Sequence, residues 1–376
     1  MGMKILICMD SWKGSLTALE ACEAAARGLG AVLPGAEIRL LPLADGGEGT
    51  LEAVSRCRPG ELRWQEVTGP FADRRVRAPF LYWPAARTAL IEMAVCAGLP
   101  LLRPEERDPL RSTTRGVGEL MRAAQEAGAE NISLALGGSA TVDGGCGMAE
   151  ALGWQFLDAG GAPLPPGGGA LRHLAKVIPP AAPFPVKVDV WCDVTNPLTG
   201  PQGAAEVFGP QKGATAQQVR LLAEGLEQWA VRVKEATGRE VAELPGGGAA
   251  GGMGAGAVAF LSCRLMPGID ALAAVTDLDA AVAAADWVIT GEGSFDAQSL
   301  GGKVVSGILA RAARGHTRVG ILAGKLDFSA AEMRREGISA AEAANAAGRP
   351  LEEALAQAKP WAEAAARRLG AKMTTA

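Results

Sequence analysis

The segment SLALGGSATVDGGCGMAEALG, residues 133–153, gives the clearest indication of the fold class. Its apolar start, with Leu134 and Leu136, has the length and composition of a buried strand. The strand pattern breaks at Gly137, and an apolar helical pattern resumes near Met148. A strand, a glycine-rich loop and a helix in this order direct backbone N–H groups at an anion, although glycine is also common in a plain βα turn. The stretch therefore predicts an α/β protein with a candidate anion-binding loop.

The same order of elements recurs near both ends of the chain. Apolar strand patterns at residues 4–9 and 38–43 are each followed by a helical pattern, and the alternation returns with strand patterns at residues 287–290 and 319–323. Short connections between alternating strands and helices predict a parallel sheet with helices on its faces. In such sheets ligands bind at the carboxyl ends of the strands.

The middle of the chain has a different pattern. Residues 61–95 alternate between apolar and polar side chains, which predicts antiparallel strands at the start of an inserted domain. A second glycine loop at residues 246–260 runs into an apolar helix, and a last helical pattern covers residues 351–369. We therefore expect a doubly wound, Rossmann-like or flavodoxin-like parallel-sheet domain, a large inserted second α/β domain, and a site in the interdomain cleft. The expected domains are residues 1–60 with 281–376, and residues 61–280.

Composition excludes several classes of protein. A net charge of −4 argues against a nucleic-acid partner, which needs a basic face. The sequence contains no run of 18 apolar residues, so no membrane span is expected. The N-terminal residues also lack a signal-peptide pattern, so a cytoplasmic location is expected. The seven cysteines include no C-x-x-C pair, and with two histidines the chain offers neither a zinc site nor histidine-centred catalysis. Acid–base chemistry is therefore expected from carboxylates or lysines.

Carboxylates stand directly after predicted strands, and lysines accompany them. Carboxylates hold Mg²⁺ through oxygen, lysines and backbone amides hold phosphate, and one carboxylate can accept the proton of the hydroxyl being phosphorylated. Each residue alone has an ordinary explanation, an N-cap for an aspartate or a solvated charge for a lysine; together they favour phosphoryl transfer. The carboxylates are Asp10, Asp45, Asp193, Asp296 and Glu292, and the lysines are Lys13, Lys212, Lys303 and Lys325.

Familiar nucleotide-binding motifs are absent from the sequence. The pattern G-x-x-x-x-G-K-[ST] fails at Gly302-Lys303, because Ala297 occupies the place of its first glycine, and no G-x-G-x-x-G follows the first strand. From spacing alone the chain is an anion-binding α/β enzyme for which phosphoryl transfer is favoured.

Six segments lie in order along nearly the whole chain: DSWKGSLTALEA (10–21), PLADGGEGT (42–50), LALGGSATVDGGCGMAEALG (134–153), DVTNPLTGPQGAAEVFGPQKGA (193–214), GGGAAGGMGAGAVAFL (246–261) and TGEGSFDAQSLGGK (290–303). Together they resemble the motifs of bacterial glycerate kinases of the type I family. The resemblance implies ATP- and Mg²⁺-dependent phosphorylation of D-glycerate by direct in-line transfer to a hydroxyl deprotonated by a carboxylate, with 2-phosphoglycerate as the usual product. It also implies two α/β domains with the site between them.

We assign roles to residues of these segments as hypotheses. Asp193 is the first candidate for the general base and Asp296 the second, while Lys13 completes the catalytic set by holding phosphate or the substrate carboxylate. Asp45 and Glu292 are candidate metal ligands. Residues expected to bind the nucleotide or its phosphates are Gly137, Gly138, Ser139, Thr141, Gly247, Gly251, Gly254 and Lys303. Residues expected to bind the substrate are Asp10, Ser11, Asp45, Gly46, Asn196 and Glu292.

Two alternatives stay open. A kinase of another small hydroxy acid or polyol would keep the phosphate loops and change the contacts to the acceptor. A non-catalytic effector-binding protein would need a DNA-binding module, and no basic helix-turn-helix segment is visible. The sequence does not say which glycine loop binds ATP and which binds the acceptor, and the oligomeric state, with a homodimer as one alternative, also stays open.

Overall fold

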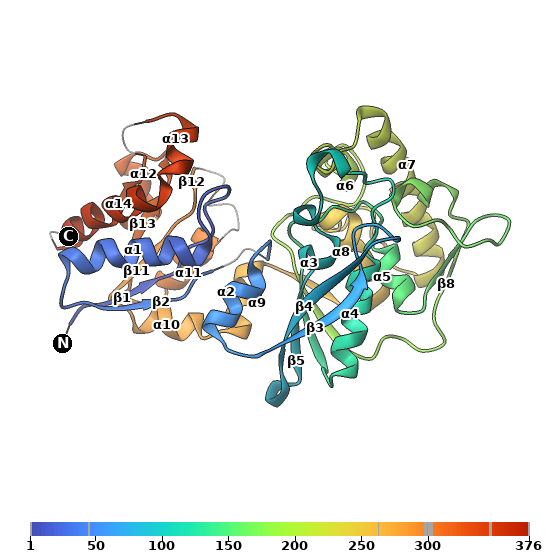
Figure 1. Cartoon of the computed structure of the whole chain (residues 1–376), viewed down its shortest axis with the longest axis horizontal. Helices are drawn as coiled ribbons and strands as arrows, with labels where there is room; N and C mark the ends of the chain where they lie inside the picture. Colours follow the sequence, from blue (N-terminus) through green and yellow to red (C-terminus); the bar gives the residue numbers. More distant parts are fainter. Residues whose placement is uncertain are drawn as a thin grey trace. The chain divides into compact units, whose positions relative to one another are not determined.

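The computed structural model describes residues 2–43, 46–261, 263–296, 299, 304–345 and 348–374. They form a mixed α/β structure with two compact units (Figure 1). Unit 1 comprises Met1–Asp45, Glu52–Pro59 and Pro267–Ala376, and unit 2 comprises Gly46–Leu51 and Gly60–Met266. Relative to the expected domains, Gly46–Leu51 and Gly60 therefore group with unit 2, and residues 267–280 group with unit 1.

Unit 1 is built on a five-stranded sheet in which all strands are parallel, in the order β15-β13-β11-β1-β2. Strand β11 is buried throughout, and β1 exposes only Lys4. The apolar runs that predict strands near both chain ends thus lie in one parallel sheet. The strands are β1 (Lys4–Ile7), β2 (Glu37–Leu40), β11 (Trp287–Thr290), β13 (Arg318–Ala323) and β15 (Ile338–Ala343), and β12 (Ser294–Phe295) pairs with β14 (Lys325–Leu326) in a separate parallel ribbon.

Helix α1 (Ala18–Val32) begins at a capping box formed by Thr17 and Glu20. The Glu20 N–H donates to Thr17 Oγ1 at 3.2 Å, and the Thr17 N–H donates to the Glu20 carboxylate at 3.0 Å. Alanine-rich faces of α1 and α14 (Ala358–Met373) pack together and cover the sheet. The other helices with residues in unit 1 are α2 (Thr50–Cys57), α9 (Gly268–Val275), α10 (Leu278–Ala284), α11 (Val304–Ala312), α12 (Ala330–Arg335) and α13 (Leu351–Ala356).

The single helix expected at residues 351–369 is wrong. The chain instead forms α13, which ends at Ala356, and α14, which begins at Ala358. Pro360 explains the break, because a proline ring collides with the carbonyl four residues earlier and has no N–H to donate. Within the first turn of α14 the missing N–H costs nothing, so the proline starts the second helix instead of interrupting one long helix.

Unit 2 has a six-stranded mixed sheet in the order β10-β9-β6-β5-β4-β3. Its β3-β4-β5 part is antiparallel, which confirms the antiparallel strands predicted at residues 61–95, and β5, β6, β9 and β10 are parallel. The strands are β3 (Glu61–Thr68), β4 (Arg75–Trp83), β5 (Thr88–Glu92), β6 (Asn131–Ala135), β9 (Lys187–Trp191) and β10 (Arg264–Met266), and β7 (Gln155–Leu157) pairs with β8 (Lys176–Ile178) in a separate antiparallel two-stranded sheet.

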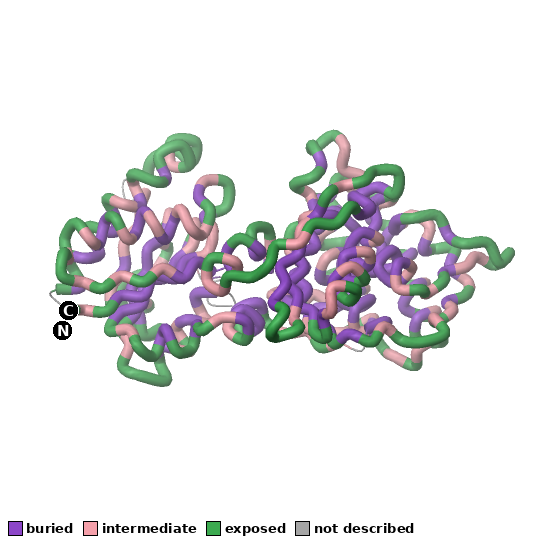
Figure 2. The backbone as a smooth tube through the Cα atoms, turned by 60° about the horizontal axis from the view of Figure 1, so that its bottom comes forward, coloured by how far each residue is buried: buried purple, intermediate pink, exposed green. Residues whose placement is uncertain are grey.

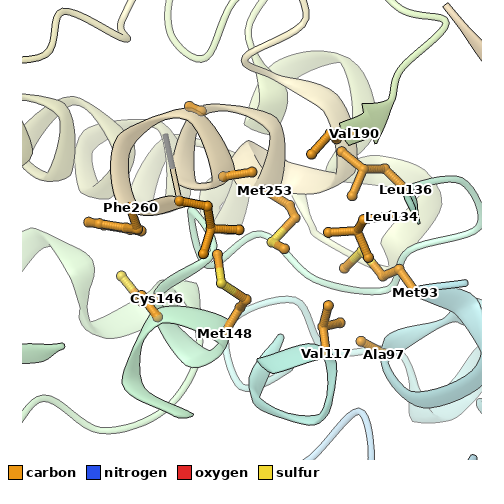
Figure 3. Packing of buried hydrophobic residues seen from close by; sticks show 14 of the residues in the cluster. Met93, Ala97, Val117, Leu134, Leu136, Cys146, Met148, Val190, Met253 and Phe260 are labelled. Atoms are coloured by element: carbon orange, nitrogen blue, oxygen red, sulfur yellow. The ribbon is translucent and has the colours of Figure 1, made fainter. Parts of the chain in front are cut away.

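Helices of unit 2 close its core. In Figure 3, Met253 of α8 points toward the side chains of Leu134 and Leu136 from β6 and its following loop, and Met148 of α5 approaches the same cluster. Figure 2 shows that the buried backbone lies in the centre of each unit, whereas loops and outer helix faces are exposed. The helices are α3 (Ala94–Ala97), α4 (Arg115–Glu126), α5 (Cys146–Ala151), α6 (Ala204–Phe208), α7 (Ala216–Thr237) and α8 (Ala249–Leu261).

Candidate active site

The carboxyl ends of β1 and β11 bring predicted site residues together in unit 1. Asp10 and Ser11 follow β1, Glu292 follows β11, and the Asp10 N–H donates to the Gly291 carbonyl at 3.1 Å. The strand order reverses here, because β2 extends the sheet on one side of β1, and β11, β13 and β15 extend it on the other. Loops leaving the sheet diverge at such a reversal, which is where open α/β sheets bind their ligands.

A pocket of about 930 Å³ lies at this edge of unit 1. Its polar lining also includes Lys325, which follows β13, and Asn345 and Arg349, which follow β15. Sequence reasoning missed Asn345 and Arg349, because the strand before them was not predicted. The predicted site residues that line the pocket are Asp10, Ser11, Lys13, Glu292 and Asp296.

A short closed loop presents Lys13 to this pocket. The Trp12 N–H donates to the Leu16 carbonyl at 2.8 Å, and the Leu16 N–H donates back to Trp12 at 3.0 Å. Trp12 is buried and Lys13 is exposed, so the indole anchors the loop while the lysine faces solvent and the pocket. The Ser11 N–H donates to Asp10 Oδ1 at 2.6 Å, which fixes the orientation of that carboxylate.

Glu292 has the chemistry of a ligand-binding carboxylate. Its backbone carbonyl accepts the Gly324 N–H at 3.2 Å, which ties the loop after β11 to the end of β13. Its Oε1 is buried and accepts no hydrogen bond from the part of the chain that the structure describes. A buried carboxylate oxygen without a donor is costly unless a ligand hydroxyl or a cation completes it. With Asp10 and Asp296 in the same pocket, its oxygen fits a hard cation such as Mg²⁺.

Within the described ranges no group of three or more His, Cys, Asp or Glu side chains could hold a metal ion. Mg²⁺ does not require one, because it commonly binds through one or two protein carboxylates together with water and substrate phosphates. Asp45, the other predicted metal ligand, and the predicted phosphate ligand Lys303 lie outside the described residues.

A second group of predicted residues gathers in unit 2, at the carboxyl ends of β5, β6 and β9. These strands are neighbours in the sheet, so the Gly137 loop after β6 lies beside the segment that carries Asp193 after β9. The Gly137 N–H donates to the Gly46 carbonyl at 2.9 Å. A Cβ on Gly137 would lie 2.3 Å from Gly47 Cα, so only glycine allows these two segments to touch. Two glycine motifs distant in sequence thus form one surface, in which exposed Gly138 and buried Ser139 follow Gly137.

Glu92, at the end of β5, holds the Gly46 segment in place. Its carboxylate accepts the Gly49 N–H at 3.1 Å and the Leu51 N–H at 3.0 Å. Burial raises the pKa of this carboxyl, and the two backbone hydrogen bonds oppose the rise. Glu92 was not singled out from the sequence, since its only local signal is a charged residue closing an apolar strand.

Lys212 is buried beneath the Gly137 loop. Its ammonium donates to Ser139 Oγ at 2.9 Å and to the Thr141 carbonyl at 2.7 Å. Burial lowers the pKa of Lys212 to about 7, and nearby Asp143 acts in the opposite direction. Thr141 is itself fully buried, so it supports this loop from below, and its expected contact with a ligand stays a prediction.

Replacing Lys212 by Met will change how stability depends on pH. Between about pH 7 and pH 10 the unfolded chain keeps a proton on Lys212 that the folded chain has released. The free energy of unfolding therefore increases as the pH rises through this range. The variant lacks this contribution. In urea unfolding at pH 7, 8, 9 and 10, the free energy of unfolding of wild type should increase relative to that of K212M at each step. The buried cysteines titrate alike in both proteins, so their contribution cancels in this difference.

The exposed lysine Lys176 provides the control for this experiment. The difference between wild type and K176M should be constant over the same pH range. Parallel profiles for wild type and K212M would contradict a lowered pKa at Lys212.

The glycine segment that begins at Gly246 is closely packed in unit 2. Gly247, Gly251 and Gly254 are buried, and a Cβ on Gly251 would lie 1.9 Å from the Thr141 carbonyl oxygen. Ala250, Gly251 and Gly252 have positive φ, which kinks the start of α8. Close packing of backbone against backbone explains why glycine stands here, and the expected anion-binding role of this segment stays a prediction.

Asn196 joins the loop after β9 to this glycine segment. Its Nδ2 donates to the Gln202 carbonyl at 2.9 Å, and its own carbonyl accepts the Gly248 N–H at 2.9 Å. Asp193, three residues earlier and half-buried, lies on the same loop. These bonds fix the loop that carries the first candidate for the general base.

Comparisons with known proteins place this arrangement in a family. The model of the glycerate kinase family matches residues 5–374, nearly the whole chain. The chain belongs to the glycerate kinase family. It is similar to the glycerate kinase of Bacillus subtilis (strain 168), at 44% identity over 100% of this chain and 98% of that protein. It is also similar to glycerate 2-kinase of Escherichia coli (strain K12), at 42% identity over 90% of this chain and 89% of that protein.

A solved structure of the glycerate kinase family has the same fold. The crystal structure of a protein described as glycerate kinase 2 from Salmonella typhimurium LT2 superposes with a TM-score of 0.83. That protein is 41% identical to this chain, and the match covers 100% of this chain and 99% of that one. The chain is thus an enzyme of the glycerate kinase family. Within the described ranges, no helix has both the length and the apolar character needed to cross a membrane.

Proposed function

We propose that the chain transfers the γ-phosphoryl group of ATP to D-glycerate, with 2-phosphoglycerate as the product. The observation that carries this proposal is the family match over residues 5–374. The Escherichia coli relative named glycerate 2-kinase supports phosphorylation at the 2-position. The carboxylates and lysines at the sheet edge of unit 1 supply the residue types that phosphoryl transfer needs.

The general base is the residue whose role matters most for the chemistry. As a glycerate hydroxyl attacks phosphorus, Asp193 would accept its proton, and Asp296 is the second candidate. Asp193 lies on the loop after β9, beside the glycine loop of unit 2, and Asp296 lines the pocket of unit 1. The expectation that the site lies between two domains stays a prediction.

Cations and amides would hold the negative groups of the substrates. Lys13 and Lys303 would bind phosphate or the glycerate carboxylate. Gly138 and Ser139 would bind a second anion, with the Ser139 hydroxyl oriented by the Lys212 ammonium, 2.9 Å from its oxygen. The Gly137 N–H already donates to Gly46, so Gly137 contributes the close approach of the two segments.

Glu292 and Asp45 would hold Mg²⁺. When bound, the ion neutralises charge on the phosphate oxygens and helps to orient them. Asp10 and Ser11, adjacent on the loop after β1, would orient substrate hydroxyls next to Glu292 and the ion that it would hold.

Replacing Glu292 by Gln will lower kcat/KM by about 10²-fold and raise the Mg²⁺ concentration needed for half-maximal rate, because the amide keeps the shape but loses the negative charge. The measurement is the initial rate of ADP release against Mg²⁺ concentration. Glu336→Gln, at an exposed residue outside the pocket, is the control and should behave as wild type. An unchanged Mg²⁺ dependence in E292Q would remove Glu292 from the metal site.

A coupled ADP-release assay with ATP, Mg²⁺ and D-glycerate tests the function itself. Turnover that requires D-glycerate is the expected result. Turnover with another small hydroxy acid or polyol, and none with D-glycerate, would show that the chain is a kinase with a different acceptor. If the folded protein releases no ADP with any of these acceptors, the proposal is overturned.

A further inference from the structure

The pocket of unit 1 has an apolar wall that the proposed chemistry does not use. Leu351 and Leu355 of α13 line it although 74% and 38% of their surfaces are exposed. Ala354, three residues after Leu351 and one before Leu355, shares the same helix face. Trp361 of α14 adds an aromatic ring to the lining. Two exposed leucines and an indole in the lining of one pocket indicate a ligand with a flat apolar part.

Charged side chains also line the pocket. Lys13, Lys325 and Arg349 lie in the lining with Asp10 and Glu292. The Lys325 N–H donates to the Gly293 carbonyl at 3.0 Å, which fixes its backbone beside the Glu292 loop.

The turn before α13 is held by a side chain. The Arg349 N–H donates to Asn345 Oδ1 at 2.8 Å, and Asn345 Nδ2 donates to the Arg349 carbonyl at 2.9 Å. The two bonds hold the backbone at Arg349, immediately before the helix that carries the leucines. Cations and an apolar face are therefore joined by a defined turn within the pocket.

Size and polarity decide between the two substrates of the proposed reaction. D-glycerate has three carbons, each bonded to oxygen, and offers nothing to an apolar wall. A pocket of about 930 Å³ is also near the upper end of the range for bound small molecules. A nucleotide has a flat base with two apolar faces and a chain of phosphates.

We propose that this pocket is the nucleotide site, with the purine base and ribose against Leu351, Leu355 and Trp361 and the phosphates toward Lys13 and Lys325. The inference rests on the proposed function for the choice of nucleotide. It assigns the ligand of a specific pocket, which the family match leaves open.

Equilibrium binding tests the assignment without turnover. Isothermal titration calorimetry with ADP and Mg²⁺, in the absence of glycerate, compares wild type with the double variant L351A/L355A. Loss of both leucine contacts should raise the Kd for ADP about tenfold. Both leucines are exposed, so the variant should keep its fold. The control L62A/V231A removes two side chains of 49% and 51% exposure in unit 2 and should bind ADP as wild type does.

A second pair of variants separates the base from the phosphates. Lys325→Met should weaken the binding of ADP and leave the binding of adenosine unchanged. L351A/L355A should weaken the binding of both ligands by the same factor. The control Lys176→Met, at an exposed lysine of unit 2, should affect neither ligand.

Unchanged ADP affinity in L351A/L355A would overturn the assignment, as would a rise in the KM for D-glycerate in place of that for ATP. This outcome is separate from failure of the proposed function. Wild type that binds ADP through these residues but does not phosphorylate D-glycerate would refute only the function. Wild type that phosphorylates D-glycerate, with ADP binding indifferent to α13, would refute only the pocket assignment.

Discussion

Replacing Asp193 by Asn will lower kcat by about 10²- to 10⁴-fold, the usual contribution of a general base. The amide occupies nearly the same space as the carboxylate but cannot accept the proton of the attacking hydroxyl. The KM for D-glycerate should change little, because the lost interaction develops in the transition state. Initial-rate kinetics over pH 6–9 measure both parameters.

A matched control lies on the preceding strand. Asp189 carries a carboxylate in β9 that pairs with Arg264 at 2.8 Å, with 44% of its side chain exposed. Asp189→Asn should retain the wild-type kcat. If folded D193N also retains it, Asp193 is not the base, and Asp296→Asn becomes the decisive variant.

Replacing Gly251 by Ala will prevent stable folding or reduce the free energy of unfolding by more than about 3 kcal/mol. The new Cβ would lie 1.9 Å from the Thr141 carbonyl oxygen and 2.6 Å from Val142 Cα, both backbone atoms of the core. The φ of +68° adds the strain of a left-handed alanine. Circular dichroism and urea unfolding measure the loss.

Gly161→Ala measures the cost of a left-handed alanine without a steric clash. Gly161 has a φ of +81° and nothing within 4 Å of its Cβ position, so its alanine variant should lose only about 1–2 kcal/mol. If G251A proves as stable as G161A and instead loses nucleotide binding, the glycine segment binds an anion. Close packing of the backbone would then not explain why glycine stands at this position.

Local patterns predicted the elements of this fold where the residues carry a strong signal. The β1 and β11 strands are apolar and β-branched, and Thr17 with Glu20 has the spacing of a capping box, so local physics and tertiary structure agree. Strand β15 was missed because ISAAEA has one β-branched residue, and pairing with β13 makes it a strand. The break at Pro360 could have been predicted, since proline penalises a continuous helix.

Part of the site could also be predicted from local sequence. Carboxylates after strands pointed to Asp10 and Glu292, because parallel strands bring their carboxyl ends to one edge. Lys212 was named from its segment, but a buried lysine has no local signature. The leucines of α13 lie more than fifty residues after Glu292, and only the tertiary structure shows that they share its pocket.

³¹P NMR of the product formed from ATP, Mg²⁺ and D-glycerate tests both the transfer and its position. The proposed function predicts a phosphomonoester at the 2-position, formed in the same amount as ADP. A signal from 3-phosphoglycerate would contradict the position, and release of inorganic phosphate without a phosphorylated acid would contradict transfer to glycerate.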